Sequence, residues 1–389
     1  MRARKNGEGS YSVVTVKGVE YQRYRYANGK QIYARSMKEL RAKKDKYEKE
    51  LKEKNIISSV DLTLSEAMQS WLETRYGKIE PTSYDHFEDI ILNHYASHKI
   101  GNYQIASITP EMLTKFFDEK KEEYALVTLD TMRFVLKSTF QYAYEQEIIP
   151  EFKLSKVSFP GKKDVKVPKK NIRIVTDDDI EKMYKEATRH YVTGSYVHPT
   201  VYRMLIFILY SGLRIGEAIG LQWDDVEKDL SAIHVNRTAA RKKRRKNDGK
   251  LETTGSKTEV ILKAPKTEKS YRTIPLPNRA VKILEELSNS EHKGTDQVFT
   301  SKTGKMVEYT SVFKALKLLI RESDCEHNDY TVHGLRHTYG SILIRKGVNI
   351  KIVSELLGHA NVAFTYNVYI GVLKEDKIQA VSVLNNILN

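Results

Sequence analysis

The segment from residue 161 to residue 170 constrains the fold more than any other feature of this 389-residue sequence. The turn-forming Phe159-Pro160-Gly161 leads into it, and five lysines follow without any apolar periodicity. Such a composition is typical of a linker, so the chain must build separate hydrophobic cores on either side of it. The length agrees, because 389 residues exceed one typical core and suggest two or three domains.

The first 58 residues combine short β-rich stretches with one charged helix. Asn28-Gly29 suits the positive φ angles of a hairpin turn, and a helical pattern runs from Ser36 to about Asn55. We therefore predict a small three-stranded sheet backed by one helix, over residues 1–58.

Strand alternation in this sheet places Arg23 and Arg25 on one face and Tyr24 and Tyr26 on the other. The arginine face can line phosphates or enter a groove of a nucleic acid. A basic appendage without a specific partner is the alternative.

Residues 59–160 predict a helical bundle with its own core. Thr63 and Glu66 have the spacing of a capping box, Thr82 or Ser83 can cap the next helix, and Thr109-Pro110 begins another. A last helix from about residue 128 to 146 is expected to bury a stripe of five residues. These are Leu129, Met132, Leu136, Phe140 and Tyr144. Residues 171–389 predict a mixed α/β domain, so the whole chain is expected to be a multidomain α+β protein.

The charge favours a polyanionic partner: the formal net charge is +15, with a pI near 9.4. Residues 1–58 hold 16 Lys and Arg against 7 Asp and Glu. Two further concentrations are Lys162-Lys163 with the lysines that follow, and the unbroken run from Arg241 through Lys242, Lys243 and Arg244 to Lys246. One such run is often a solvated face, but three of one sign repel each other unless something negative offsets them.

Membrane and secreted proteins are excluded as classes by the same sequence. The longest apolar run, near residues 204–209, is far shorter than the ~20 residues of a membrane span. The N-terminus shows no signal-peptide pattern. Cys325 is the single cysteine, so no intramolecular disulfide forms and a reducing interior is expected. We expect a cytoplasmic protein.

Residues 205–221 predict two helices separated by a break at Gly212, with Arg214 at the break among apolar neighbours. A buried arginine needs an anionic partner. Glu217 lies three residues on and can hold Arg214 in a structural ion pair, or the arginine can meet an anionic ligand.

Three later segments carry further polar side chains. Lys266 lies near a polar turn, at residues 268–270, that joins two predicted strands between Ala264 and Leu276. His333 and Arg336 share one helix face, where an arginine can bind phosphate oxygens and an imidazole can move a proton. His359 follows a helix end with Gly358 at the left-handed position, and Tyr369 comes ten residues later. Each signal alone is weak.

Together, the ordered set "SGLRIGE", "PKT…RTIPL", "HGLRHT", "LLGH" and a tyrosine ten residues later resembles the catalytic signature of the tyrosine recombinases, the phage integrase family. Residues 171–389 resemble the catalytic domain. Residues 59–160 resemble the family's core-binding domain. Residues 1–58 resemble the arm-binding domain of integrases from Gram-positive conjugative transposons and related phages.

The resemblance implies a site-specific DNA recombinase that integrates and excises a mobile genetic element through a 3′-phosphotyrosine. By this resemblance, Arg214 and Arg336 would bind the phosphate oxygens and Lys266 would be the general acid. His333 would act as an acid or base, His359 would donate a further hydrogen bond to the phosphate, and Tyr369 would be the nucleophile. Arginines beside a tyrosine would lower its pKa from about 10. The sequence departs from the family at Tyr366, a second tyrosine three positions upstream, and in a basic insert at 241–260 whose strand pairing stays open.

The implied partners are double-stranded DNA at core-type and arm-type sites, and an excisionase or host DNA-bending protein in a bacterial cell. No cofactor or metal is implied, because the phosphodiester energy is kept in the covalent bond. An amphipathic pattern at residues 374–389 predicts a tail helix that joins neighbouring protomers of a DNA-bound tetramer. Two alternatives remain: a type IB topoisomerase, which uses the same chemistry to relax DNA, and a non-catalytic DNA-binding regulator.

Overall fold

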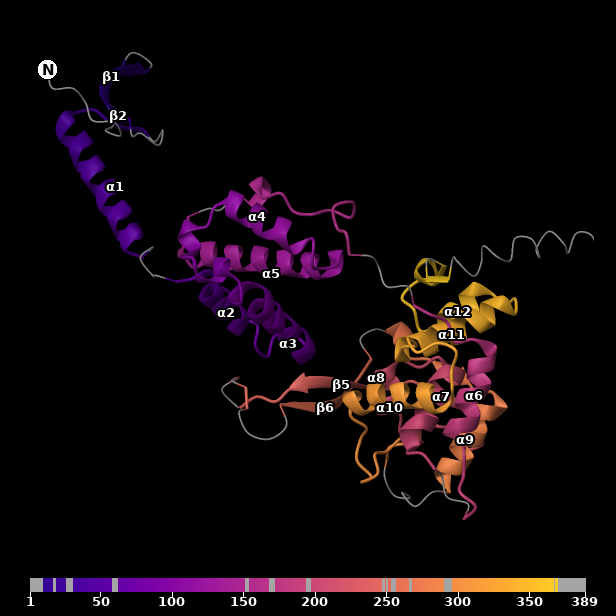
Figure 1. The fold of residues 1–389 in the computed structure, drawn as a ribbon. Helices are drawn as coiled ribbons and strands as arrows, with labels where there is room; N and C mark the ends of the chain where they lie inside the picture. Colours follow the sequence, from indigo (N-terminus) through magenta and orange to yellow (C-terminus); the bar gives the residue numbers. More distant parts are fainter. Residues whose placement is uncertain are drawn as a thin grey trace, which may run out of the picture. The chain divides into compact units, whose positions relative to one another are not determined.

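The computed structural model describes residues 10–16, 19–25, 31–57, 62–150, 154–167, 172–193, 197–246, 249, 251–252, 257–265, 268–289, 296–366 and 368–369. The predicted features that lie outside these residues include Tyr26, the hairpin turn at Asn28-Gly29, Lys266 and the segment 374–389. The chain divides into two compact units, Met1–Lys169 and Lys170–Asn389, and Figure 1 labels all of their α-helices and some of their strands. The predicted combination of a small sheet, a helical bundle and a mixed α/β catalytic region is confirmed.

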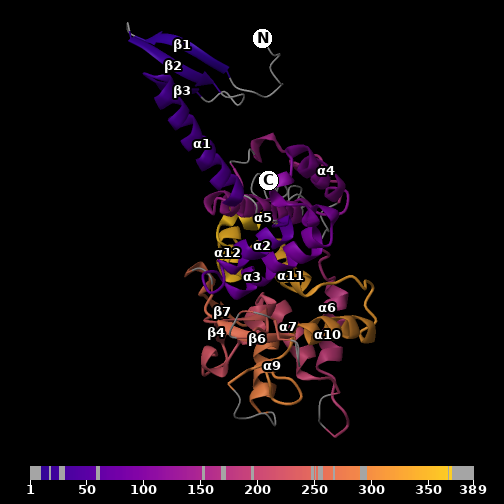
Figure 2. The ribbon, with the colours of Figure 1, turned by 90° about the vertical axis from the view of Figure 1, so that its left-hand side faces the viewer.

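The N-terminal sheet is antiparallel, in the order β1-β2-β3, and α1 packs on one of its faces (Figure 2). The bounds are β1 Ser10–Val16, β2 Val19–Arg25, β3 Gln31–Ala34 and α1 Met37–Ile57. Tyr24 is buried with Ala34 and Leu40, under the helix. Arg23 pairs with Ser12 on one side and Tyr33 on the other, on the opposite face from Tyr24, as strand alternation predicts.

The rest of the first unit is helical. Its elements are α2 Leu64–Glu73, α3 Pro81–Ile90, a π-helical turn Ile91–Ala96, α4 Pro110–Lys120, α5 Leu126–Glu145 and 3₁₀ turns at Lys99–Asn102, Ile105–Ser107 and Leu154–Lys156. The capping box exists as predicted, since Thr63 accepts from the amide of Glu66 and Glu66 accepts from the amide of Thr63. The core is apolar and aromatic, with Trp71, Tyr95, Phe116 and Phe117 almost fully buried.

Two details of the predicted bundle are wrong. The helix expected to start at Thr82 or Ser83 is preceded by Glu80, because Pro81 occupies the first helical position, where its missing N–H has no intrahelical partner to lose. Tyr144 lies on the solvent side of α5 with half of its surface exposed, because the buried stripe turns to Ala143 near the helix end.

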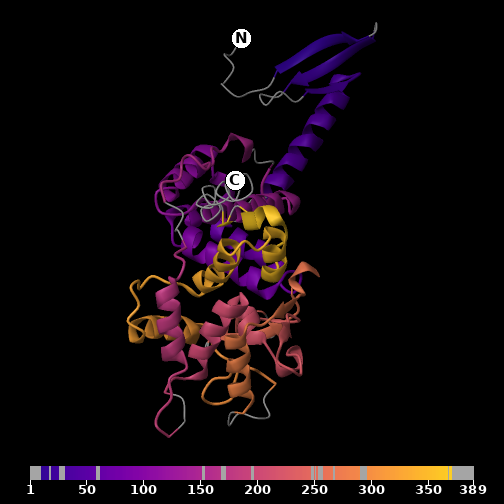
Figure 3. The same ribbon diagram turned by 90° about the vertical axis from the view of Figure 1, so that its right-hand side faces the viewer.

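The second unit is built around α7, whose side chains are buried on nearly all sides by α6, α9, α10 and α11. Its elements are α6 Asp177–Ala187, α7 Thr200–Ser211, α8 Ile215–Gly220, a 3₁₀ turn Trp223–Asp225, β4 Ala232–His234, β5 Thr238–Lys243, β6 Thr258–Lys263, a 3₁₀ turn Glu268–Ser270, β7 Thr273–Pro275, α9 Asn278–Ser288, α10 Tyr309–Glu322, α11 Val332–Arg345 and α12 Ile350–Leu357. Helices α11 and α12, in the yellow part of the chain, pack against each other (Figure 3). Within the described parts of the chain, no helix is both long and apolar enough to span a membrane.

The basic insert forms an antiparallel hairpin of β5 and β6, in which Arg241 pairs with Val260 and Lys242 with Glu259. The polar turn at 268–270 lies between two strands, β6 and β7, but these do not pair with each other: β6 pairs with β5, and β7 pairs with β4. The hairpin packs closely against α8. A Cβ at Gly216 would lie 2.6 Å from the carbonyl oxygen of Ala239 in β5, so only glycine allows this approach.

Candidate active site

The site begins at the turn between α7 and α8. Gly212 ends α7 with a φ of +67°, a left-handed conformation that favours glycine. Arg214 then stands at the N-cap of α8 and Glu217 one turn later. The Glu217 carboxylate accepts from the Arg214 amide at 2.8 Å and from Arg214 Nη1 at 2.7 Å. The ion pair expected between these two residues is therefore present.

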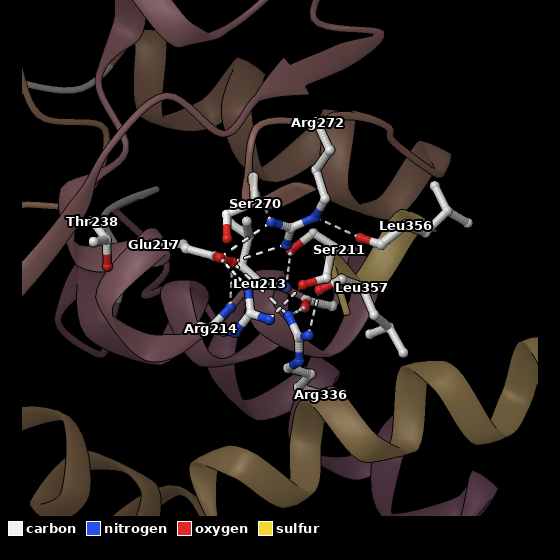
Figure 4. Close-up of polar contacts among 12 residues, drawn as sticks. Ser211, Leu213, Arg214, Glu217, Thr238, Ser270, Arg272, Arg336, Leu356 and Leu357 are labelled. Atoms are coloured by element: carbon white, nitrogen blue, oxygen red, sulfur yellow. Dashed lines mark hydrogen bonds and ion pairs between the residues drawn. The ribbon is translucent and has the colours of Figure 1, made fainter. Parts of the chain in front are cut away.

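Glu217 is the centre of a larger cluster of charges, drawn in Figure 4. Arg272 bonds both of its oxygens, with Nη2 at 2.9 Å from Oε2 and Nη1 at 3.1 Å from Oε1. Arg336 Nη1 lies 3.9 Å from Oε2. Burial would raise the pKa of Glu217, but the hydrogen bond and charge of Arg272, followed by the charges of Arg214 and Arg336, lower it to about 2. One buried carboxylate thus faces three guanidinium groups.

Backbone carbonyl groups, several of them at the C-terminal end of α12, are the other partners of these arginines. Arg336 donates to the carbonyl oxygens of Gly212 (2.7 Å) and Leu357, and Arg214 Nη2 donates to the carbonyl of Gly358 at 2.7 Å. Arg336 is almost fully buried. Burial, followed by repulsion from Arg214, lowers its pKa to about 9, so its positive charge is only partly compensated by the protein.

The predicted histidines lie beside this cluster. The pKa of His333 is lowered by burial and then by Arg336 and Arg214, and the pKa of His359 falls to about 3 for the same reasons in the same order. His359 Nδ1 lies 2.8 Å from the hydroxyl of Thr365. Both imidazoles are therefore neutral near pH 7, in a form that can accept or donate a hydrogen bond.

Tyr369 lies against α11. Its ring packs with Ile344, Val353 and Leu357, and a Cβ at Gly340 would overlap its hydroxyl group. Burial raises the pKa of Tyr369 to about 12, although the charge of Arg336 acts in the lowering direction. The sequence-based expectation that arginines lower this pKa is therefore wrong in sum, because burial outweighs them. Tyr366, by contrast, is half exposed.

The described residues of the predicted set therefore come together: the charges of Arg214 and Arg336 act on His333 and His359, and that of Arg336 acts on Tyr369. Lys266 lies outside the described residues. Sequence reasoning missed two members of this neighbourhood. One is Arg272. The other is His337, whose ring centroid lies 4.4 Å from that of His333 and 5.6 Å from that of Tyr369.

The remaining cations singled out in the sequence lie at the surface of the chain. Lys162, Lys163, Arg25, Arg241 and Arg244 are exposed. In the β5–β6 hairpin, Glu259 accepts from Lys242 at 3.0 Å and lies 3.8 Å from Arg244. Arg23 donates to Ser12 at 2.9 Å. A role of these residues in binding DNA stays a prediction.

One cluster away from this site has the ligand types of a metal centre, formed by Glu186, His198 and Glu322. Arg189 pairs with Glu186 at 2.8 Å, and the Tyr202 hydroxyl donates to Glu322 at 2.8 Å. Both carboxylates already have protein partners, so an ion-pair network accounts for the cluster.

Arginines and neutral histidines beside a tyrosine suit phosphoryl transfer to that tyrosine. In an α/β unit of a chain that also contains a helical bundle, such a site defines a class: enzymes that transfer DNA strands. Residues 173–376 match the Phage integrase family, and residues 63–121 match the N-terminal SAM-like domain of phage integrases. The chain belongs to the phage integrase family and is a tyrosine site-specific recombinase.

Similar proteins include a tyrosine recombinase XerC-like protein of Caldanaerobacter subterraneus subsp. tengcongensis, 26% identical over 98% of this chain and 97% of that protein. The transposase of transposon Tn916 from Enterococcus faecalis is 24% identical over 70% of this chain and 65% of its own length. Among solved structures, the Tn1549 transposon integrase in complex with transposon right end DNA has a TM-score of 0.61 at 19% identity, covering 82% of this chain and 99% of that one.

Proposed function

We propose that this chain integrates and excises a mobile genetic element by cutting and rejoining double-stranded DNA through a 3′-phosphotyrosine on Tyr369. Relatives support the biological setting: they include the prophage ps2 probable integrase of Lactococcus lactis and the ICEBs1 integrase of Bacillus subtilis. The similar Tn1549 integrase was solved with circular intermediate DNA and with transposon right end DNA, which supports double-stranded DNA as the partner.

The observation that carries the proposal is the unequal charge around Glu217. Three guanidinium groups meet one carboxylate, which leaves a local excess of two positive charges. A phosphodiester carries one negative charge, and the pentavalent phosphorane formed on attack carries two. The excess therefore matches the transition state better than the bound substrate, which is the condition for accelerating the reaction.

Each predicted residue then has a defined task. The hydroxyl of Tyr369 attacks the phosphorus, and Arg214 and Arg336 bind the non-bridging oxygens. His333 handles the proton of the nucleophile and His359 donates to the phosphate, while Lys266 protonates the leaving 5′-oxygen. The products are a 3′-phosphotyrosine and a free 5′-hydroxyl, which can attack another phosphotyrosine without ATP.

A nicked suicide substrate tests the chemistry, because it loses a short strand after cleavage and traps the covalent complex. We expect the full-length chain to form this adduct and Tyr369→Phe to abolish it. Tyr366→Phe is the matched control, since the exposed Tyr366 lies one helical turn away; it should leave the adduct unchanged. Loss of the adduct in Tyr366→Phe but not in Tyr369→Phe would refute the assignment.

Two plasmids that each carry one recombination site separate the recombinase from a topoisomerase. A recombinase joins the two plasmids, whereas a topoisomerase only relaxes them.

The basic residues predicted to bind DNA are proposed to contact two kinds of site. Arg23 and Arg25 bind the arm-type site, and Lys162, Lys163 and the cations from Arg241 to Arg244 bind phosphates near the core-type site.

We also propose that the active form is a tetramer on DNA, joined by the segment 374–389, and that an excisionase or host DNA-bending protein assists it. Deletion of residues 374–389 should abolish recombination and leave binding to a single site intact. Recombination at the unaltered rate would contradict the role of the tail.

A further inference from the structure

Arg272 lies within the arginine cluster but is not among the six residues predicted to act on the phosphate. We propose that it is a positioning residue. It bonds both the end of α12 and Glu217, and thereby keeps Arg214, Arg336 and His359 at fixed distances from one another, without itself contacting DNA. This inference rests on the proposed function, in that it names a further residue for the same reaction.

Three consecutive carbonyl groups at the end of α12 each accept a hydrogen bond from a different arginine. Leu356 accepts from Arg272 Nε at 2.7 Å, Leu357 from Arg336, and Gly358 from Arg214 at 2.7 Å. The last carbonyls of a helix have no intrahelical donor and carry the negative end of its dipole. The three arginines belong to different segments, so this helix end ties the segments together.

Arg272 differs from its two neighbours in how its donors are used. The Arg272 side chain donates four hydrogen bonds to other protein groups: one to the carbonyl of Leu356, two to the carboxylate of Glu217 and one from Nη1 to the carbonyl of Ser270 at 3.2 Å. Its side chain is 6% exposed, against 40% for Arg214; Arg336 is as buried, at 3%, but makes two hydrogen bonds to protein where Arg272 makes four. Arg214 is therefore placed to meet a phosphate, while Arg272 offers little surface to one.

The contact between Arg272 and the turn before His359 is close. Gly358 has a φ of +62°, and a Cβ there would lie 3.0 to 3.2 Å from three side-chain atoms of Arg272. Arg272 therefore packs directly against the turn that positions His359. Through Glu217 it also reaches Arg214, whose backbone amide and guanidinium both bond that carboxylate.

Loss of the Arg272 side chain would remove its hydrogen bonds to both carboxylate oxygens of Glu217 and to the carbonyl oxygen of Leu356. The arginines and His359 would keep their chemistry but lose their fixed spacing. A misplacement of about 1 Å can cost on the order of 100-fold in rate. Because Arg272 does not meet DNA in this arrangement, affinity should change far less than rate.

The test uses the full-length chain with Arg272→Met, which removes the charge and all donors, and Arg272→Lys, which keeps the charge but not the paired geometry. Arg279→Met is the matched control. Arg279 bonds both oxygens of Glu181, at 2.5 and 2.9 Å, in the same unit but away from the cluster. For each variant we would measure the single-turnover cleavage rate of the suicide substrate at saturating DNA, and the Kd for the uncleaved site.

We expect Arg272→Met to cleave about 100-fold more slowly with a Kd within about threefold of the unaltered chain. Arg272→Lys should recover only part of the rate, and Arg279→Met should retain it. An unchanged rate in Arg272→Met, full recovery in Arg272→Lys, or a rate loss matched by an equal loss of affinity would overturn the inference. The last result would make Arg272 a DNA ligand.

Hydrogen–deuterium exchange of a peptide spanning residues 354–362 gives a second readout that needs no cleavage. It should quicken in Arg272→Met and in Arg272→Lys but not in Arg279→Met, and unchanged exchange in both Arg272 variants would overturn the inference. If the unaltered chain forms no adduct, the proposed function fails while this exchange still tests Arg272. If Arg272→Met does not fold, Arg272→Lys carries both measurements.

Discussion

The helical region at 62–150 and the arginine cluster of the second unit bury side chains of opposite kinds. In the helical region the buried positions are Trp71, Phe116 and their apolar neighbours. In the arginine cluster they are Glu217 and Arg336, with 5% and 3% of their surfaces exposed. Burial of an apolar side chain stabilises the folded state whichever apolar neighbours surround it, because the hydrophobic effect has no direction. A buried charge is tolerated only with particular partners, and here those partners come from segments far apart in the sequence.

The comparison leads to different expectations for substitutions. In the helical region a substitution should lower stability in proportion to the volume removed. In the arginine cluster it should leave other charges unpaired, and so affect stability and catalysis together. The two tryptophans of the chain, Trp71 and Trp223, lie one in each unit. In a Trp71→Phe or Trp223→Phe background, fluorescence therefore reports the unfolding of one unit alone.

The largest effect is expected at Glu217. Replacement by leucine keeps the approximate volume but leaves Arg272, Arg214 and Arg336 without their shared carboxylate. The second unit should lose about 3–5 kcal/mol of stability, as when one partner of a buried ion pair is removed. Urea unfolding followed by Trp223 would measure it. Glu217→Gln, which keeps a hydrogen-bond acceptor, should lose less. Equal or higher stability of Glu217→Leu would show that the cluster does not depend on this pairing.

A core truncation in the helical region should have the next largest effect. Leu113 is fully buried in α4, and Leu113→Ala should cost about 2–5 kcal/mol by lost burial and the cavity left behind. Trp71 fluorescence would report this loss. Val127, largely exposed on α5, provides the control, because Val127→Ala should stay within about 0.5 kcal/mol. A large effect at Val127 would mean that this region does not follow burial.

The smallest expected effect is a dependence of stability on pH, which we predict for the second unit and its arginine cluster. The folded-state pKa values of His337 and His359, about 4 and 3, lie below the usual 6.5, so the unfolded chain binds more protons than the folded one. Stability of the second unit should therefore fall as the pH drops below about 6.5. From pH 7 to 5 we expect a loss of about 1–2 kcal/mol, discounted for partial exposure of His359. Trp223 fluorescence at each pH would measure it.

The histidine variants identify the source of this slope. His337→Gln should flatten it, and His327→Gln, in the same unit but outside the cluster, should not. A steeper dependence in the Trp71 signal than in the Trp223 signal would contradict the assignment of the acid sensitivity to the arginine cluster.

Much of the architecture follows from local patterns in the sequence. The capping box at Thr63, the left-handed Gly358 and the Arg214–Glu217 pair each depend on residues within a few positions of one another. The start of α3 at Pro81 was missed because two competing caps follow it. The pairing of β7 with β4 could not be predicted, because the whole β5–β6 hairpin separates the two strands in the sequence.

Arg272 was missed for a different reason. Its partners Glu217 and Leu356 lie 55 and 84 residues away, so no local pattern links them. One signal was available: Ile274 is buried in β7, and strand alternation places Arg272 on the same inward face. An arginine on the inner side of a strand needs an anionic partner inside the protein. This pattern marks Arg272 as a buried cation but does not identify Glu217 as its partner.

The seating of the β5–β6 hairpin on α8 has a mechanical consequence. Gly216 lies one residue before Glu217 and touches the backbone of β5, and Gly220 makes a second close approach at Ala239. Because these two glycines bring the backbones of α8 and β5 into direct contact, we expect a displacement of β5 to shift α8 as well. A DNA backbone that binds and displaces the cations of β5 would therefore also shift Arg214, which begins α8.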